Sequence, residues 1–493
     1  MNNFPALIVI CPLCAALLNL LLNRYNERLG KAVTVLSVAA SLIMSVFLLA
    51  QVITSGTVHY HMGNYDMPLG IEFVIDTVNG LIVVLVSLIG FLTLLFSDNF
   101  GYKFKTRLNK GAANTVLTLL IVGLLGMTLT GDVFNLYVFL EITSLSAYCL
   151  IALGGERGIF SAYRYLLVGT VAATFYLLGV AILYGATGTL NMADMTDILN
   201  QGGKDEAMLI AICFLVPAFG IKMALFPFHG WQPSAYSYSE AGAAPLITGV
   251  MGKIPAYAMF RYLYCIYGSD FKYFSAILLI VGIFSVFGML YGSIRAIAQT
   301  DIRKILAYSS VAQIGYISLG FAIGTPIALC GAFLHMLGHA FMKGGLFFCT
   351  GAIRHKFGTV NIEDFGRIYK KMPLTCATLT IAALSMIGIP PTVGFFSKWY
   401  LGSAAATQGE WIYLAVLVIS SLLNAIYFFR LIEKVFINED KGLKERVYDE
   451  FRICGWKMIL PIVVCFVAIL MLGLANVKIV DILMLSLKGV GLC

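Results

Sequence analysis

Long apolar runs recur along the whole chain and decide what it can fold into. A helix of eighteen or more mostly apolar residues crosses the hydrocarbon core of a bilayer. Of the 493 residues, 60% are hydrophobic and 12% are charged, whereas a soluble domain carries roughly 25% charge. Ten-residue segments of alternating polarity, the mark of a membrane barrel, are absent from the sequence. The pattern therefore predicts an all-α polytopic membrane protein.

The runs predict fourteen membrane spans. The first has no basic leader and no small-residue cleavage site, so we expect it to be the first helix and not a signal peptide. The predicted spans are residues 4–22, 32–53, 72–96, 112–130, 133–153, 162–185, 207–239, 243–264, 273–293, 302–322, 326–350, 373–407, 411–436 and 456–476.

The distribution of basic residues supports this count, because cytoplasmic loops carry the excess of Lys and Arg. Of the 33 such residues, 24 follow odd-numbered spans, whereas the connection 55–70 has none. An error of one span would destroy the alternation. We therefore expect a multi-pass protein of the cell membrane with both termini outside. The net charge of +8 reflects these loops and does not indicate a nucleic-acid partner.

Two of the predicted spans are interrupted by helix-breaking residues. In the seventh, Lys222 is followed by Pro227 and Pro233; in the twelfth, Pro390 and Pro391 precede Lys398. Proline removes a backbone donor, so nearby carbonyls lose their helical partners. Transporters build ion sites from helices broken in this way at mid-membrane depth.

The positions of the two breaks also predict an internal repeat. They lie five spans apart, and because five is odd, two five-helix units would cross the membrane in opposite directions. We predict four parts: residues 1–110 with spans 1–3, 111–265 and 266–436 as inverted repeats, and 437–493 with the last span. The charged stretch 433–451 is expected to be amphipathic and to lie along the membrane surface.

Charged and titratable residues lie inside several predicted spans. Each charge at the bilayer centre costs at least roughly 2.5–3.5 kcal/mol on insertion scales, so a set spread over several helices indicates a polar path. The set consists of Glu141, Lys222, Lys253, His335, His339, Lys343 and Lys398.

Glu141 in the fifth span needs a partner or a proton, and Lys222 is the candidate. A pair of this kind stabilises both charges and can act as a switch if the carboxylate moves away. The alternative is a static ion pair that holds two helices together. Lys253 would be the next station. Both lysines have a second interpretation, in which the ammonium group reaches the membrane surface.

His335, His339 and Lys343 follow one another at intervals of four, which places them on one face of the eleventh helix. Such a polar stripe suits a proton wire with intervening waters. A zinc or haem site is the alternative, but no third ligand or HExxH pattern accompanies the histidines. The eleven cysteines lie mostly inside apolar runs and are interpreted as small core residues, so we expect no cofactor or metal. Tyr308, Ser309, Ser310 and Gln313 are expected either to hold waters or to pack helices.

Several of these stretches resemble one known family. They are TGDVFNLYVFLEITSLSAYCLIAL, FGIKMALFPFHGWQPSAYS, DIRKILAYSSVAQIGYI, HMLGHAFMKGGLFFCTGAI and GIPPTVGFFSKW. The chain resembles, over nearly its whole length, the antiporter-like subunits shared by complex I, Mrp-type cation/proton antiporters and membrane-bound hydrogenases. The resemblance implies fourteen helices, inverted repeats, broken helices 7 and 12, and functional roles for Glu141, Lys222, Lys253, His335 and His339.

Lys398 resembles the lysine-type end of the relay in the D-type subunits of Mrp antiporters. The run after the break departs from the pattern of many family members, which continue with an aspartate and a histidine after a WxP motif. Here Pro233 is followed by Ser234, Ala235 and Tyr236. The resemblance implies a proton-translocating subunit with other membrane subunits as partners, and protons and possibly sodium as transported ions. A hydrogenase-linked or NADH-quinone oxidoreductase subunit is the first alternative. A quinone- or haem-binding redox subunit, a scaffold and a stand-alone transporter are the others.

Overall fold

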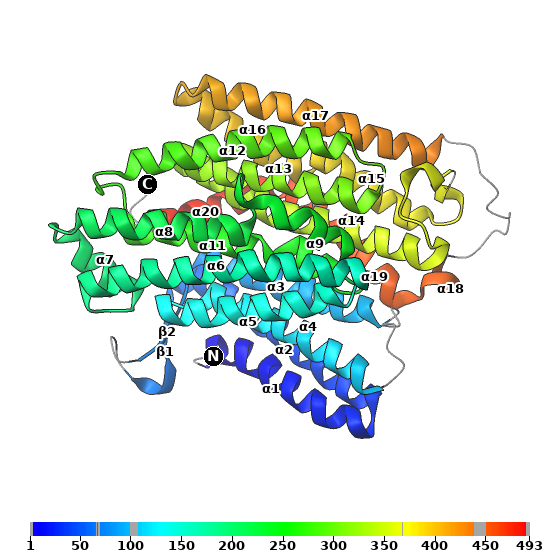
Figure 1. Ribbon diagram of the computed structural model, residues 1–493, viewed down its shortest axis with the longest axis horizontal. Helices are drawn as coiled ribbons and strands as arrows, with labels where there is room; N and C mark the ends of the chain where they lie inside the picture. The colour runs from blue at the N-terminus through cyan, green and yellow to red at the C-terminus, as the bar shows by residue number, and fades with distance from the viewer. Residues whose placement is uncertain are drawn as a thin grey trace.

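The computed structural model describes residues 3–65, 67, 70–98, 107–366, 368–437 and 450–489. Long helices run nearly parallel to one another along the longest axis of the molecule (Figure 1). A small hairpin of β1 (Val58–His61) and β2 (Glu72–Ile75) lies with α7 (Met192–Asn200) at one end, which we call the hairpin end. The opposite end, where α1 (Phe4–Tyr25) ends and α2 (Glu27–Ser55) begins, is called the basic end.

The N-terminal part contains three long helices and the hairpin, which the sequence did not predict. The strands are antiparallel, with Val58 opposite Ile75 and His61 opposite Glu72. Asp76 and Asn79 form a capping box that begins α3. The elements are α1 (Phe4–Tyr25), α2 (Glu27–Ser55), β1 (Val58–His61), η1 (Met62–Asn64), β2 (Glu72–Ile75) and α3 (Thr77–Ser97).

The next part contains predicted spans 4–8. Its seventh span is broken between α8 and α9, and its eighth is divided by π-helical turns. The elements are α4 (Arg107–Leu129), α5 (Val133–Ala152), α6 (Glu156–Thr187), α7 (Met192–Asn200), α8 (Asp205–Met223), η2 (Phe228–Trp231), α9 (Gln232–Tyr238), α10 (Ala244–Leu246), η3 (Ile247–Met251), α11 (Lys253–Phe260) and η4 (Arg261–Tyr267).

The third part contains predicted spans 9–13, with the second break between α15 and α16. The elements are α12 (Phe274–Ile297), α13 (Ile302–Ile323), α14 (Pro326–Phe357), η5 (Ile362–Asp364), η6 (Ile368–Lys370), α15 (Pro373–Ile387), α16 (Val393–Thr407) and α17 (Trp411–Phe436). The chain ends with α18 (Glu450–Cys454), α19 (Trp456–Leu474) and α20 (Asn476–Gly489), of which α20 was not predicted.

The predicted fold class is confirmed. Within the described residues, twelve helices are long and apolar enough to cross a membrane. The segmented spans 244–267 and 373–407 lie in sequence where the two remaining predicted spans were placed. Of the stretch predicted to be amphipathic, residues 438–449 lie outside the described part of the chain.

The predicted repeat is visible in two matched loops at opposite ends of the molecule. Gly188, Thr189 and Asn191 recur as Gly358, Thr359 and Asn361, and both glycines have a φ of 73°. Asn191 forms an antiparallel bridge with Asp132, and Asn361 forms the same bridge with Asp301. The first loop precedes α7 at the hairpin end, whereas the second precedes η5 at the basic end (Figure 1). The two five-helix units are therefore oppositely directed.

A second matched pair consists of two arginines on the last helix of each unit. Arg261 donates to the carbonyl of Thr130, just beyond the C-terminus of α4. Arg430 donates to the carbonyls of Ile297 and Gln299, at the C-terminus of α12. The last carbonyls of a helix have no N–H partners within the helix. Each arginine therefore donates hydrogen bonds to such carbonyls at the C-terminus of the first helix in its own unit.

Candidate functional site

The first part of the site joins α5 to the end of α8. Lys222 Nζ donates to Ser144 Oγ at 2.7 Å and lies 3.7 Å from Glu141 Oε1. The second distance is that of an ion pair without a direct hydrogen bond, and Glu141 Oε1 has no hydrogen-bond partner among the described residues. Lys222 is 3% exposed and Glu141 is 29% exposed. The ammonium group is therefore enclosed, whereas the Glu141 side chain is partly exposed at the surface of the bundle, with its Oε1 atom buried.

The helix break positions Lys222 one residue before the end of α8. Ala224 follows in the left-handed conformation, with a φ of 61°, and ends the helix. The carbonyl of Ile221 accepts a hydrogen bond of 2.8 Å from the indole nitrogen of Trp231, beyond the break. As the proline pattern predicted, a carbonyl beside Lys222 acquires a side-chain partner.

Lys253 lies at the start of α11, where a π-helical turn interrupts the preceding helix. The N–H of Gly252 bonds to Val250. The Thr248 carbonyl accepts a hydrogen bond of 2.7 Å from Lys253 Nζ. Lys253 is buried, so it does not reach the surface as the alternative interpretation required.

The eleventh span, α14, carries its three polar residues into the centre of the molecule, where all are buried. Lys343 donates to the Leu306 carbonyl and to Ser309 Oγ, both at 2.5 Å. His339 has no hydrogen-bond partner on either ring nitrogen among the described residues. Its ring stacks beside that of His335, with centroids 5.8 Å apart.

Lys398 closes the series at the second helix break. Its Nζ donates to the carbonyls of Met386 at 2.9 Å and Ile387 at 3.0 Å, which end α15. The ammonium group also lies 4.7 Å from the centre of the Tyr316 ring. Carbonyls at a helix C-terminus and an aromatic face both stabilise a cation, so the break forms a cradle for this charge.

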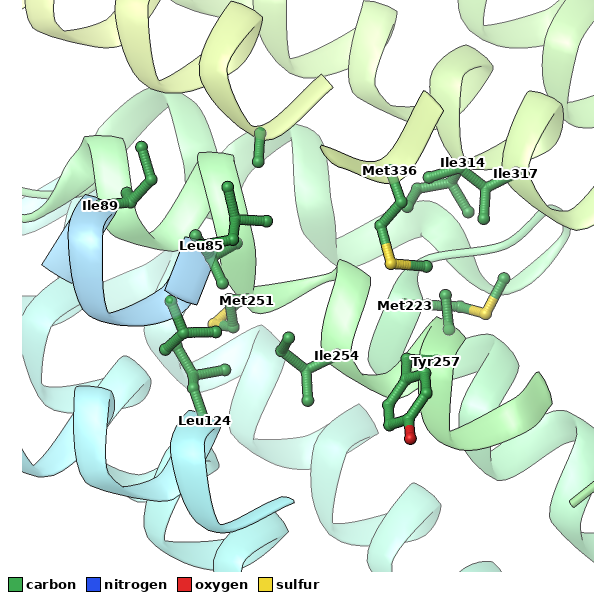
Figure 2. Close-up of a cluster of buried hydrophobic side chains, with 14 of the residues drawn as sticks. Leu85, Ile89, Leu124, Met223, Met251, Ile254, Tyr257, Ile314, Ile317 and Met336 are labelled. Atoms are coloured by element: carbon green, nitrogen blue, oxygen red, sulfur yellow. The ribbon is translucent and has the colours of Figure 1, made fainter. Parts of the chain in front are cut away.

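Apolar side chains surround this polar path. Met251 and Ile254 lie within two residues of Lys253 in the sequence. Figure 2 shows them between Leu85 of α3 and Leu124 of α4 on one side and apolar residues of α13 and α14 on the other. The cluster is fully or almost fully buried. A low-polarity surrounding strengthens electrostatic interactions between the buried charges.

The structure brings some predicted residues together and leaves others separate. Glu141 contacts Lys222, and His335 lies beside His339. Lys253, Lys343 and Lys398 each bond to carbonyls or hydroxyls of their own neighbourhood. Ser397 Oγ lies 2.9 Å from His335 Nδ1. The sequence did not reveal Ser144, Ser397 or Tyr316 as partners, because hydroxyl residues are common on membrane helices, nor the backbone carbonyl of Thr248. The only indication in the sequence that one of these residues belongs to the site was the position of Ser397 directly before Lys398.

The hairpin end has a separate polar cavity of about 670 Å³, lined by Glu72, Asp76, Asp197 and Arg261 among others. Glu72 binds His59 Nδ1 at 2.6 Å and Asn191 Nδ2 at 3.0 Å, so the hairpin is tied to the first repeat loop. Burial raises the pKa of Asp76, although a hydrogen bond from Asn79 and the charge of Arg261 act in the opposite direction.

A helical membrane bundle with two broken helices and several buried titratable residues is typical of proteins that transport ions. The chain belongs to the NADH:quinone oxidoreductase/Mrp antiporter transmembrane family, whose model matches residues 130–424.

Known relatives agree with this membership over almost the whole length. The chain is 45% identical to the N subunit of the NADH-quinone oxidoreductase of Desulforudis audaxviator, over 97% of each chain. It is 31% identical to the D subunit of the Na(+)/H(+) antiporter of Alkalihalophilus pseudofirmus, over 96% of this chain and 94% of the relative. A chain in the structure of the Mrp complex from Dietzia sp. has a TM-score of 0.87, with 26% identity over 99% of this chain and 97% of that one.

Proposed function

We propose that the chain is the proton-translocating subunit of a multisubunit cation/proton antiporter, similar to the D-type subunits of Mrp complexes. Protons load Lys222 under the control of Glu141, pass Lys253 and the α14 residues Lys343, His339 and His335, and leave from Lys398. The observation that carries the proposal is the buried Lys222 ammonium group, 3.7 Å from a carboxylate at a helix break. Because a nearby carboxylate favours the charged ammonium form, moving the carboxylate of Glu141 away makes Lys222 release its proton more readily. This electrostatic effect couples one titratable residue of the relay to the next.

The exposure of Glu141 favours a partner subunit on the α5 face. Val138 and Leu145, one turn before and after it, are 39% and 57% exposed. Lipid tails cannot satisfy a carboxylate at this depth, whereas a neighbouring membrane subunit can. The proposed complex therefore covers this face of α5 with protein.

The subunit is proposed to lie in the plasma membrane with the basic end in the cytoplasm and both termini outside, since the basic connections follow odd-numbered spans. Residues 111–265 and 266–436 are the proposed functional halves, preceded by 1–110 and followed by 437–493. Sodium is the proposed counter-ion of the complex, by similarity to the relative named as part of a Na(+)/H(+) antiporter.

The alternative is a proton-pumping subunit of an NADH-quinone oxidoreductase complex. It is favoured by the relative with 45% identity, which carries that name. Gentle solubilisation of the native membrane and identification of the copurifying subunits distinguishes the two. Small hydrophobic antiporter subunits support the first proposal, whereas iron–sulfur subunits support the alternative.

The relay is tested by Lys222→Ala in the assembled complex, reconstituted in proteoliposomes. We expect coupled proton flux to be abolished while all subunits still copurify. Lys272→Ala, which removes an exposed lysine from the α11–α12 connection, is the control. Wild-type flux in Lys222→Ala would contradict the proposed function.

A further inference from the structure

His335 is held at both ring nitrogens by partners from two different helices. Its Nε2 lies 2.8 Å from Gln313 Oε1 on α13, and its Nδ1 lies 2.9 Å from Ser397 Oγ on α16. All three side chains are buried. The ring is therefore fixed in position and in the direction that each nitrogen faces.

The partner at Nε2 decides which nitrogen gains and loses the proton. In this orientation of the Gln313 amide, the oxygen faces the ring and can only accept, so Nε2 carries a hydrogen in both the neutral and the protonated ring. The amide nitrogen of Gln313 has no hydrogen-bond partner among the described residues. The exchangeable proton then belongs to Nδ1, on the side of α16. His339 differs, because neither of its nitrogens has such a partner among the described residues.

Ser397 is suited to both states of Nδ1. Its hydroxyl also lies 3.1 Å from the Gly394 carbonyl, one turn back in α16. When Nδ1 is bare, the hydroxyl donates to it. When Nδ1 carries a proton, that N–H donates to Ser397 Oγ, and the hydroxyl hydrogen turns to Gly394.

We propose that Ser397 is a positioning residue of the relay, which together with Gln313 presents the exchangeable proton of His335 toward α16, the helix that carries Lys398. The inference rests on the proposed function and adds a direction to it. The transfer from α14 to the second broken helix occurs on the Nδ1 side, and the hydroxyl keeps the ring oriented in both states.

The test compares three variants in the reconstituted complex. Ser397→Ala leaves the protonated ring without its acceptor, so we expect proton flux to fall about tenfold, less than the roughly 10²–10⁴-fold that a group transferring the proton itself contributes, because Ser397 only positions the ring. Ser397→Thr keeps the hydroxyl and is expected to recover most of the flux. Ser318→Ala removes a buried hydroxyl of α13 that bonds to Ser285, and serves as the matched control with wild-type flux.

A spectroscopic measurement keeps the inference testable if a variant assembles poorly. Nitrogen-15 NMR of the histidine-labelled complex, with His335 assigned by its loss in His335→Gln, reports the tautomer. We expect the neutral ring to carry its hydrogen on Nε2 in the wild type and a mixture of tautomers in Gln313→Leu. A neutral ring protonated on Nδ1 in the wild type would overturn the inference.

The two proposals fail in distinguishable ways. If Lys222→Ala is inactive while Ser397→Ala and its tautomer match the wild type, the role of Ser397 is wrong and the relay stands. If Lys222→Ala itself transports normally, the proposed function is wrong, whatever the tautomer of His335.

Discussion

At the scale of single residues, the charges inside the spans and the pairing of Glu141 with Lys222 were predictable, whereas the neutral partners of the lysines were not. Glu141, Lys222 and Lys398 are conspicuous because an ionisable residue in an apolar run is costly. Ser144 and Tyr316 are ordinary residues of membrane helices, and their contacts join segments 78 residues apart in the case of Lys222 and Ser144. Only the packing of the helices reveals such pairs.

The carboxylate of Glu141 can be removed with little change in shape. Glu141→Gln leaves Lys222 with Ser144 but without a countercharge. We expect proton flux to fall about tenfold or more, because a nearby opposite charge favours the ammonium form that carries the proton. Flux assays on the reconstituted complex check this. Glu156→Gln, at the start of α6, is the control, and equal activity of the two variants would contradict the prediction.

At the scale of elements, the two helix breaks use the same backbone conformation with different residues. Ala224 ends α8 with a φ of 61°, and Gly388 ends α15 with a φ of 98°. The breaks themselves were predictable from proline and glycine. The left-handed alanine was not, because alanine favours a right-handed helix.

This difference predicts opposite effects of two exchanges on stability. Gly388→Ala is expected to destabilise by about 1 kcal/mol, because the conformation is strained for any residue with a Cβ. The new Cβ would also lie 3.2 Å from Lys398 Cδ. Ala224→Gly is expected to relieve comparable strain. Thermal unfolding of the purified complex measures both, and shifts of the same sign would contradict the prediction.

The two arginines that bind the helix ends differ in burial, so their removal should differ in effect. Arg261 is 8% exposed, whereas Arg430 is only partly buried. Arg261→Leu leaves a buried carbonyl without a partner, which costs about 1–3 kcal/mol. At Arg430 water can replace part of the lost interaction, so a smaller loss is expected. The unfolding temperatures of the two variants give the comparison.

At the scale of the whole molecule, the span count and the alternation of basic loops were predictable because both follow from the bilayer. The repeat was predicted only from the spacing of the breaks. The matched Gly-Thr-x-Asn loops also mark the repeat in the sequence, but a motif of four residues is too short to identify a repeat by itself. The hairpin and α20 were missed, because short segments are fixed by what they pack against.

A charge cluster joins distant parts of the chain at the basic end. Asp98, at the end of α3, lies 2.5 Å from Lys31 Nζ on α2 and also binds Lys457 on α19. Burial alone would raise the pKa of Asp98, but the hydrogen bonds and charges of the two lysines outweigh it and hold the pKa below its ordinary value.

The direction of this shift gives a pH dependence. A carboxyl group whose pKa is lower in the folded than in the unfolded protein stabilises the fold when the pH is above its pKa in the unfolded state. That stability is lost as the pH falls below about 4. Asp98→Asn should therefore cost about 1 kcal/mol at neutral pH, a modest amount because the cluster is partly exposed. The difference from wild type should vanish in acid. Unfolding at several pH values tests this, and a constant difference would contradict it.

The opposed direction of the two five-helix units has a consequence for biogenesis. Residues 268–273, between η4 and α12, are the seam between them. A gene divided at this seam would encode two proteins, one ending with η4 and one beginning near α12. Because three spans precede the first unit, both proteins would begin on the same side of the membrane, although the five-helix units within them cross it in opposite directions. Each would carry one broken helix and one Gly-Thr-x-Asn loop. Coexpression of the two halves would then test whether the proton path requires one continuous polypeptide, or whether two separately synthesised halves that associate in the membrane are sufficient.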